Sequence, residues 1–169
     1  MKRIISLSMS CLMALTICTV ISCSKEVEEE ASDGYVNLGL SSGTKWKTVN
    51  EVNAADADYA FFTYDEAIAQ YGNKLPSREK WMELVNECEW TWTGMGYKVV
   101  GPNGKSISLP AEGYRRCDGS VYILGSNGYY WSSTPYGSEK AWYLYFISGS
   151  VHSNGSGRCC GRSVRLVQD

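Results

Sequence analysis

The residues of this chain that could do redox or nucleophilic chemistry are few, and most lie near the C-terminus. Cys159 and Cys160 are adjacent, the only histidine is His152, and Cys117 and Cys88 lie upstream. Zinc sites favour cysteine pairs separated by two residues, a spacing that is missing here. His152 has no predicted carboxylate beside it that would orient it as the base for a nucleophile. The sequence therefore predicts no metal site, no cofactor and no catalytic residue, and we expect the chain not to be an enzyme.

The same C-terminal region is rich in residue types that suit binding. Between Gly128 and Val167 it holds two of the six tryptophans and five of the twelve tyrosines. Between Ser148 and Gly157 nearly every residue is Gly, Ser, Asn or His. Rigid aromatic side chains beside small polar ones are typical of a displayed binding surface. The predicted ligand-binding residues are Tyr130, Tyr136, Tyr143, Tyr145, His152, Asn154 and Ser156.

The N-terminus has the pattern of an export signal. Lys2 and Arg3 precede the apolar run from Ile4 to Ile21, so residues 1–22 are predicted to be a lipoprotein signal peptide. Val20-Ile-Ser-Cys23 resembles the bacterial lipobox, in which the final cysteine is lipidated. The alternative is an uncleaved membrane helix, because about 18 apolar residues nearly span a bilayer.

Residues 23–34 are acidic and are predicted to be a solvated tether. This segment also resembles the tether that marks some outer-membrane lipoproteins for the cell surface. Because the signal peptide carries Lys2 and Arg3, the net charge falls from −2 to about −4 without it. An acidic domain is not expected to bind nucleic acid. With no second apolar span, the lipid is the expected membrane attachment, and the predicted location is the outer membrane, exposed at the cell surface.

Two short helices are predicted early in the domain. Thr63-Tyr-Asp-Glu66 is a capping box that predicts a helix over Tyr64–Tyr71, with Gly72 as the residue that ends it. Ser77 is the expected N-cap of a second helix. Its apolar residues recur at helical spacing and form one stripe, made of Trp81, Leu84, Val85 and Cys88.

Short strands are predicted over most of the remaining chain. They cover residues 35–40, 44–49, 97–100, 106–109, 129–133, 141–146 and 163–167, with a turn at Gly101-Pro-Asn-Gly104. Within 141–146, alternation places Trp142, Leu144 and Phe146 in the core, whereas Tyr143 and Tyr145 are expected to face solvent or a ligand. Trp131, Val164 and Leu166 are expected to be buried, and residues 148–157 are expected to be a loop. The fold class predicted for residues 35–169 is α+β.

Five ordered segments carry a resemblance to a known family. They are Tyr35-Val-Asn-Leu-Gly-Leu-Ser-Ser-Gly-Thr-Lys-Trp46, Leu75-Pro-Ser-Arg-Glu-Lys-Trp81, Leu109-Pro-Ala-Glu-Gly-Tyr-Arg115, Gly128-Tyr-Tyr-Trp-Ser-Ser-Thr134 and Gly161-Arg-Ser-Val-Arg165. Over residues 35–167 the chain resembles the Fibrobacter succinogenes major paralogous domain. That family is similar to the formylglycine-generating-enzyme branch of the C-type-lectin-like fold. The resemblance implies two short helices followed by a twisted, mainly antiparallel sheet with a loop-rich C-terminal half.

The resemblance does not carry over catalysis or calcium binding. Formylglycine generation uses a pair of active-site cysteines, and the adjacent Cys159 and Cys160 do not match that motif. Calcium-dependent lectins use a Glu-Pro-Asn or Gln-Pro-Asp loop and a Trp-Asn-Asp strand, whereas Gly101-Pro-Asn-Gly104 lacks the acid and Trp131 is followed by serines. We therefore expect a non-catalytic lectin-like ligand-binding or adhesion domain for an unknown glycan or protein. The alternatives are a formylglycine-generating-type oxidoreductase and a structural subunit of a surface filament.

The C-terminal region also resembles the target proteins of diversity-generating retroelements. In those proteins, adenine-directed mutagenesis changes AAC and AAT codons. One set of positions holds only residue types that are reachable in this way, namely Ile147, Ser150, His152, Ser153, Asn154, Gly155, Ser156, Gly157 and Cys160. The alternative is an ordinary polar loop, since loops favour Gly, Ser and Asn.

The exported cysteines are free to form disulfides, but their spacing does not fix the pairing. A bond between the neighbours Cys159 and Cys160 would need a strained ring. Cys117 lies in the loop before the variable stretch, and Cys159 lies just before the last predicted strand. The favoured disulfide is Cys117–Cys159, with Cys160 free or variable and Cys88 as a core thiol.

Overall fold

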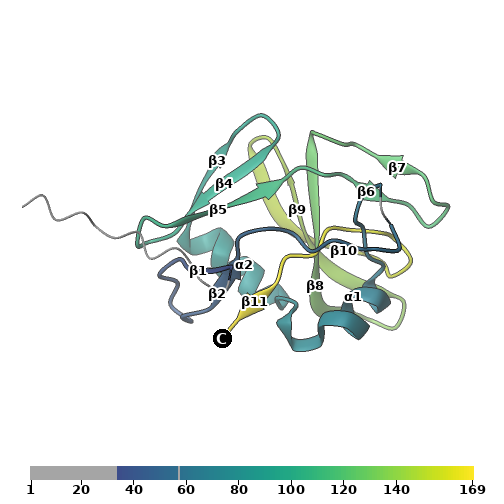
Figure 1. Cartoon of the computed structure of the whole chain (residues 1–169), viewed down its shortest axis with the longest axis horizontal. Coiled ribbons are helices and arrows are strands. Elements are labelled where there is room, and N and C mark those ends of the chain that lie inside the picture. Colours follow the sequence, from purple (N-terminus) through teal and green to yellow (C-terminus); the bar gives the residue numbers. More distant parts are fainter. Residues whose placement is uncertain (1–33, 57) are drawn as a thin grey trace, which may run out of the picture.

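The computed structural model describes residues 34–56 and 58–169 (Figure 1). The predicted signal peptide (1–22), the lipidation site at Cys23 and all but the last residue of the tether lie outside the described residues. Within the described part of the chain, no helix is both long enough and apolar enough to cross a membrane.

The first helix, α1 (Tyr64–Tyr71), begins and ends at the predicted residues. The Thr63 hydroxyl accepts a hydrogen bond from the Glu66 amide at 3.3 Å, and the Glu66 carboxylate accepts one from the Thr63 amide at 2.8 Å. Gly72, with a φ of 50°, follows the last helical turn. The capping box thus satisfies two amides that have no partner inside the helix.

A short 3₁₀ helix, η1 (Gly72–Lys74), leads to the second helix, α2 (Arg78–Glu87). Ser77 is the N-cap, as predicted, and its hydroxyl accepts from the amide of Lys80 at 3.3 Å. The predicted stripe faces the core, with two residues fully buried and two partly buried: Trp81, Leu84, Val85 and Cys88. Cys88 is a free thiol, and burial raises its pKa to about 11, so the prediction of a core thiol is confirmed.

The described strands pair antiparallel in four small sheets. One sheet consists of β1 (Tyr35–Asn37), β2 (Lys45–Lys47) and β11 (Val167–Gln168), and a second of β3 (Glu89–Trp92), β4 (Gly96–Val100) and β5 (Ser106–Pro110). The third consists of β8 (Asn127–Tyr136), β9 (Lys140–Ile147) and β10 (Ser150–Gly157). The fourth is the pair of β6 (Tyr114–Arg115) with β7 (Val121–Tyr122). The β3–β5 sheet lies toward one end of the molecule and the β6–β7 ladder toward the other (Figure 1). The α+β prediction is confirmed.

The central sheet has β9 in the middle and is packed on both faces, which corrects the prediction for β9. Leu144 and Phe146 are fully buried on one face, as expected. Tyr143 on the opposite face is only 8 % exposed, and it packs in a second cluster that includes Trp131. Trp142, expected in the core, is only half-buried. Alternation identified which residues share a face, but it could not show that both faces would be covered.

The segment expected to be a loop at residues 148–157 forms the strand β10 instead. It pairs with β9 without interruption, from Ser150 opposite Ile147 to Gly157 opposite Lys140. Gly, Ser and Asn are weak strand formers, so the pairing depends on the free backbone edge that β9 offers. A Cβ at Gly155 would lie 2.5 Å from the ring of Tyr136, so this strand also needs a small residue there.

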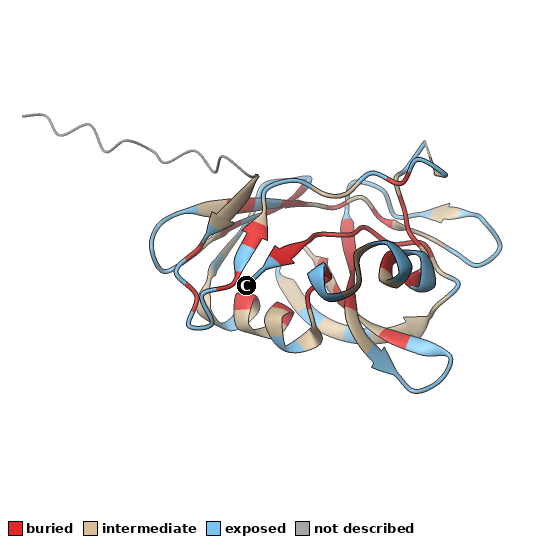
Figure 2. Cartoon of the chain, turned by 60° about the horizontal axis from the view of Figure 1, so that its bottom comes forward, coloured by how far each residue is buried: buried red, intermediate tan, exposed pale blue. Residues whose placement is uncertain are grey.

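The C-terminal segment, residues 161–167, is buried along its whole length (Figure 2). The predicted strand at 163–167 is mostly irregular, and only its end enters β11. Isolated bridges join the segment to Phe62, Arg115 and Tyr130. Val164 and Leu166 are buried, as predicted.

Close packing of β8 on β9 leaves no room for a side chain at Gly128, where a Cβ would overlap the ring of Phe146. We expect Gly128→Ala to lower the free energy of unfolding by about 1–3 kcal/mol, because overpacking forces side chains out of their rotamers. Urea denaturation measures the change. The matched control is Gly157→Ala, whose Cβ would make an ordinary 3.5 Å contact with the Cys159 sulfur. An equal loss in both variants would contradict the packing explanation.

Candidate functional site

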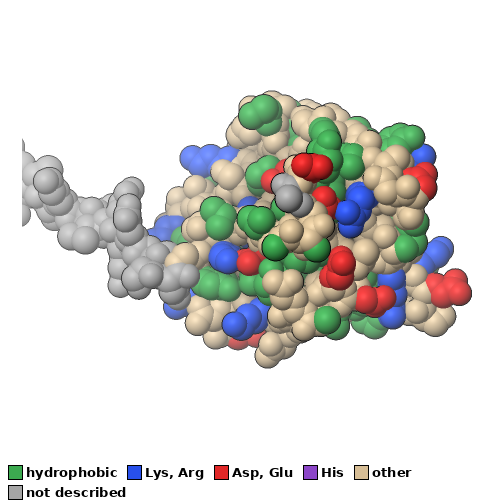
Figure 3. Space-filling model, turned by 45° about the vertical axis from the view of Figure 1, so that its right-hand side comes forward, with side chains coloured by type: hydrophobic (Ala, Val, Ile, Leu, Met, Phe, Trp, Pro, Cys, Tyr) green, Lys and Arg blue, Asp and Glu red, His purple; other side chains and the backbone are tan. Residues whose placement is uncertain are grey.

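A pocket of about 570 Å³ opens where β6, β8, β9 and β10 meet the start of the C-terminal segment. Its lining residues are Tyr114, Arg116, Cys117, Asp118, Tyr129, Tyr143, Ser156, Cys160 and Arg162. The volume falls within the range of about 300–1,000 Å³ that is usual for ligand sites. The surface at this end of the molecule mixes apolar, basic and acidic side chains (Figure 3).

Three tyrosines from three different strands form the wall of the pocket. The ring centroids of Tyr114 and Tyr129 are 4.7 Å apart, and those of Tyr129 and Tyr143 are 5.9 Å apart. Burial raises the pKa of Tyr129 to about 12 and also raises the pKa of Tyr143. The phenols therefore stay protonated at neutral pH, where each can donate and accept hydrogen bonds.

Arg162 lies against these rings and is only 2 % exposed. Its guanidinium carbon is 3.7 Å from the ring centroid of Tyr143, 4.8 Å from that of Trp131 and 5.2 Å from that of Tyr129. The negative faces of the rings stabilise the cation, although burial lowers its pKa. Its Nε and Nη1 atoms have no hydrogen-bond partner among the described residues. Both atoms are buried, so the guanidinium is held by the surrounding rings rather than by hydrogen bonds, and it places a positive charge beside the pocket.

The second buried arginine, Arg165, shows what a purely structural guanidinium looks like in this fold. Its Nε donates to the Asn50 side chain at 2.9 Å, and its two Nη atoms donate to the carbonyls of Lys47 and Ser108 at 2.8 Å each. These bonds join β2, β5 and the loop after β2. Burial alone therefore does not leave an arginine of this protein without acceptors, and Arg162 differs from Arg165 in that respect.

The rim of the pocket on the β6–β7 side is charged and exposed. The guanidinium of Arg116 stacks 3.7 Å from the centroid of Tyr122 on β7. Asp118 accepts hydrogen bonds from the hydroxyl and the amide of Ser120, and these bonds hold the pKa of its carboxyl below the ordinary value. Charged groups of both signs therefore flank the entrance.

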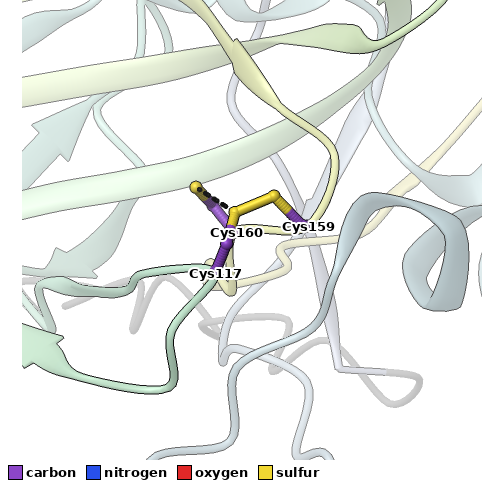
Figure 4. Close-up of side chains that lie close together, drawn as sticks. All are labelled: Cys117, Cys159 and Cys160. Carbon is purple, nitrogen blue, oxygen red and sulfur yellow. Dashed lines mark hydrogen bonds between the residues drawn. A yellow bond between two sulfur atoms is a disulfide. The ribbon is translucent and has the colours of Figure 1, made fainter.

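Three cysteines meet at the edge of the pocket (Figure 4). Cys117 and Cys159 form the predicted disulfide, which ties the loop before β7 to the segment after β10. Cys160 is a free thiol, as predicted, and its sulfur lies 3.6 Å from that of Cys117. All three sulfurs lie within 4.8 Å of one another. While the disulfide is closed, the group offers one thiolate, which is too few ligands for zinc.

The structure separates the seven predicted ligand-binding residues. Tyr143 and Ser156 line the pocket. Tyr130 is fully buried, and its hydroxyl donates to the carbonyl of Pro110 at 2.7 Å. The prediction of ligand contact at Tyr130 is wrong, because Tyr130 pairs with Leu144 and shares that residue's core-facing side of the sheet.

The other four predicted contacts lie outside the pocket. Tyr145 is half-buried and meets the exposed His152 edge to face, with ring centroids 4.8 Å apart. Tyr136, which is 49 % exposed, packs on Trp142, and Asn154 is exposed on β10. A role in binding for Tyr136, Tyr145, His152 and Asn154 stays a prediction.

Sequence reasoning missed much of the pocket. Tyr114, Tyr129 and Arg162 were not singled out, although all three occur in the motifs that carry the family resemblance. One signal was available: Tyr129 lies two residues before Trp131, so both point to the same side of β8. For Arg162 the sequence offered no sign of burial, because arginines are mostly exposed.

Comparison with known proteins gives one match. The model of a family described as a domain of unknown function (DUF8237) matches residues 89–167. This range runs from β3 into β11 and includes every lining residue of the pocket, but not the two helices. Neither the curated proteins nor the solved structures include a significant match.

The buried tyrosines predict a loss of stability in alkali. Burial raises the pKa of five of them: Tyr64, Tyr71, Tyr129, Tyr130 and Tyr143. The folded state keeps these protons when the unfolded state has lost them. Their contribution to stability is therefore complete below about pH 10 and is lost as the pH rises toward 12. Urea denaturation at stepwise pH should show this decline.

We expect Tyr129→Phe to make that decline shallower, because the variant keeps the ring but has no phenol to ionise. Tyr59→Phe is the control, since Tyr59 is 40 % exposed and lies outside the pocket lining. Equal alkaline slopes in the wild type and in Tyr129→Phe would contradict the assignment.

Proposed function

We propose that this chain is a surface-anchored outer-membrane lipoprotein whose folded domain binds a ligand without catalysing a reaction, and that the tyrosine–arginine pocket is the binding site. The observation that carries the proposal is Arg162, a buried cation with two unused donors at a pocket walled by Tyr114, Tyr129 and Tyr143. The guanidinium carbon lies 3.7 Å from the ring centroid of Tyr143, so a positive charge and flat aromatic area meet at one pocket.

The proposal includes a C-type-lectin-like fold for residues 35–169. Two short helices precede a set of antiparallel sheets. β1 and β11 both pair with β2, so the two ends of the domain lie together. This arrangement supports the assignment, because the resemblance implies two short helices and a mainly antiparallel sheet.

The chemistry of the pocket favours an acidic glycan as the ligand. Tyrosine rings offer flat apolar area and a hydroxyl at low entropic cost, which suits the face of a sugar ring. A guanidinium binds a carboxylate or sulfate through two parallel hydrogen bonds. A sugar that carries such a group would stack on Tyr114 or Tyr143 and direct its acid toward Arg162.

The acid–base groups of the pocket support binding rather than catalysis. Asp118 is the carboxylate among the lining residues, and its hydrogen bonds to Ser120 lower its pKa. An efficient general acid or base needs a pKa near the working pH. These hydrogen bonds lower the pKa of Asp118 and so move it further from neutral pH. Burial raises the pKa of Tyr129 and of Tyr143, which also moves both phenols further from neutral pH.

A glycan array with acidic and neutral sugars tests the proposal, using the full chain purified in detergent. We expect binding to acidic glycans that weakens as salt is added, because salt screens the ion pair. Tyr114→Ala should weaken binding about tenfold, since it removes one stacking surface. Tyr136→Ala is the matched control and should change the affinity by less than about twofold, because Tyr136 lies outside the pocket.

Three outcomes would contradict this assignment. Preference for neutral sugars would argue against Arg162 as the anchor, and a larger loss in Tyr136→Ala would move the site to the outer face of the β8–β9 hairpin. Capture of a protein and not of a glycan would point to adhesion by protein contact. The enzymatic alternative would be visible as copper-dependent oxidation of a cysteine-containing peptide, lost in Cys159→Ser, and the filament alternative as self-assembly.

A further inference from the structure

We propose that the three cysteines at the edge of the pocket form an internal thiol–disulfide exchange site, in which Cys160 attacks Cys117 and moves the disulfide from Cys117–Cys159 to Cys117–Cys160. The inference concerns the chain's own sulfur chemistry. It holds whether or not the pocket binds a glycan.

Geometry places the nucleophile beside its target. The Cys160 sulfur lies 3.6 Å from the Cys117 sulfur, just beyond the near-attack range of about 3.0–3.5 Å. Because all three sulfurs lie within 4.8 Å of one another, the Cys160 side chain must rotate into line with the Cys117–Cys159 bond before it attacks. The Cys117 sulfur lies between the sulfurs of Cys160 and Cys159 (Figure 4). Cys117 has no thiol proton in the disulfide, so Cys160 is the donor in this contact. The attacked sulfur is thus the one shared by both forms of the bond.

The exchange needs no external oxidant or reductant. The Cys160 thiol loses its proton to solvent, and the thiolate attacks the Cys117 sulfur through the usual exchange step. The Cys117–Cys160 bond forms, the Cys117–Cys159 bond breaks, and Cys159 leaves as a thiolate that takes up a proton. One disulfide and one thiol are present before and after the step, so the oxidation state of the chain does not change.

Neighbouring groups are suited to hold the attacking thiolate. The hydroxyl of Ser156 donates to the Cys160 sulfur at 3.7 Å. Arg162 lies two residues further along and lines the same pocket. Burial lowers the pKa of Arg162, and the smaller interaction with Cys160 raises it. The pocket is also open to solvent, so a base can reach the thiol.

Loop closure does not favour either form. The sequence separation is 42 residues for Cys117–Cys159 and 43 for Cys117–Cys160. The entropy of closing a loop depends on the logarithm of its length, so the two bonds constrain the unfolded chain almost equally. The balance between the forms is therefore set by local contacts, which a change at the pocket can shift.

The two forms differ in which thiol is accessible. With Cys117–Cys159 closed, the free thiol is Cys160, which is half-buried and lines the pocket. After exchange the free thiol is Cys159, which is exposed and outside the pocket lining. The step thus carries a reactive thiol from the pocket to the outer surface.

Alkylation of the full chain, purified in detergent without reductant, tests the exchange. The protein is treated with iodoacetamide at about pH 8, digested in acid and sequenced by tandem mass spectrometry, which separates labels on Cys159 and Cys160. We expect label on both residues, with the share on Cys159 growing with time and growing faster at about pH 8 than at about pH 6, because the thiolate is the nucleophile. Label confined to Cys160 at all times would overturn the proposal.

Two serine variants give matched controls. Cys160→Ser should lose all labelling of Cys159, because the thiol beside Cys117 is gone and the Cys117–Cys159 bond stays closed. Cys159→Ser should still contain a disulfide, now Cys117–Cys160, and should unfold near the wild-type temperature. Cys117→Ser should label at both remaining positions and unfold at a lower temperature. Free Cys117 and Cys160 thiols in folded Cys159→Ser, or labelled Cys159 in Cys160→Ser, would show that no exchange site exists.

Discussion

The burial of two arginines on one extended segment is the constraint on which the rest of this structure depends. Residues 161–167 are buried from end to end, and a buried charge is costly unless partners surround it. Arg165 meets this demand with three hydrogen bonds, which fix the positions of β2 and β5. Arg162 meets it with aromatic faces, which fix Tyr129 and Trp131 on β8 and Tyr143 on β9. The two guanidiniums hold the four small sheets on one segment.

The pocket follows from the way the charge of Arg162 is stabilised, which is by aromatic rings. Rings stabilise a cation over their faces but accept few of its hydrogen bonds, so two donors stay unused. The same rings prevent other protein groups from reaching the guanidinium. Because Cys159 and Cys160 come just before Arg162 in the chain, the turn that brings the arginine inward also brings both sulfurs to Cys117. The pocket and the sulfur cluster therefore meet at one turn of the backbone.

Local signals in the sequence predicted local structure well. The capping box defined the start of α1 and Gly72 its end, and Ser77 together with the apolar stripe defined the start and the buried face of α2. What could not be predicted depends on segments far apart in the chain. Tyr143 is buried because Tyr64 and Ala67 of α1, and Leu75 after it, pack in the same cluster. β10 is a strand because β9 pairs with it, against its own composition. Arg162 is buried because rings from β6, β8 and β9 converge on it.

The form of β10 also changes how variation in this region should be viewed. An edge strand is held by backbone hydrogen bonds to its neighbour, and these do not depend on its side chains. His152 and Asn154 lie opposite Tyr145 and Tyr143, on the same face of the sheet. Both are exposed, so they can vary at little cost to stability. Gly155 lies too close to Tyr136 to accept a side chain, and Cys160 is confined by the sulfur cluster. The nine positions that match codon-directed variation are therefore not equivalent. Sequence composition groups them together, whereas packing disfavours a side chain at Gly155 and confines Cys160, so a diversified surface of this protein would be narrower than its sequence pattern.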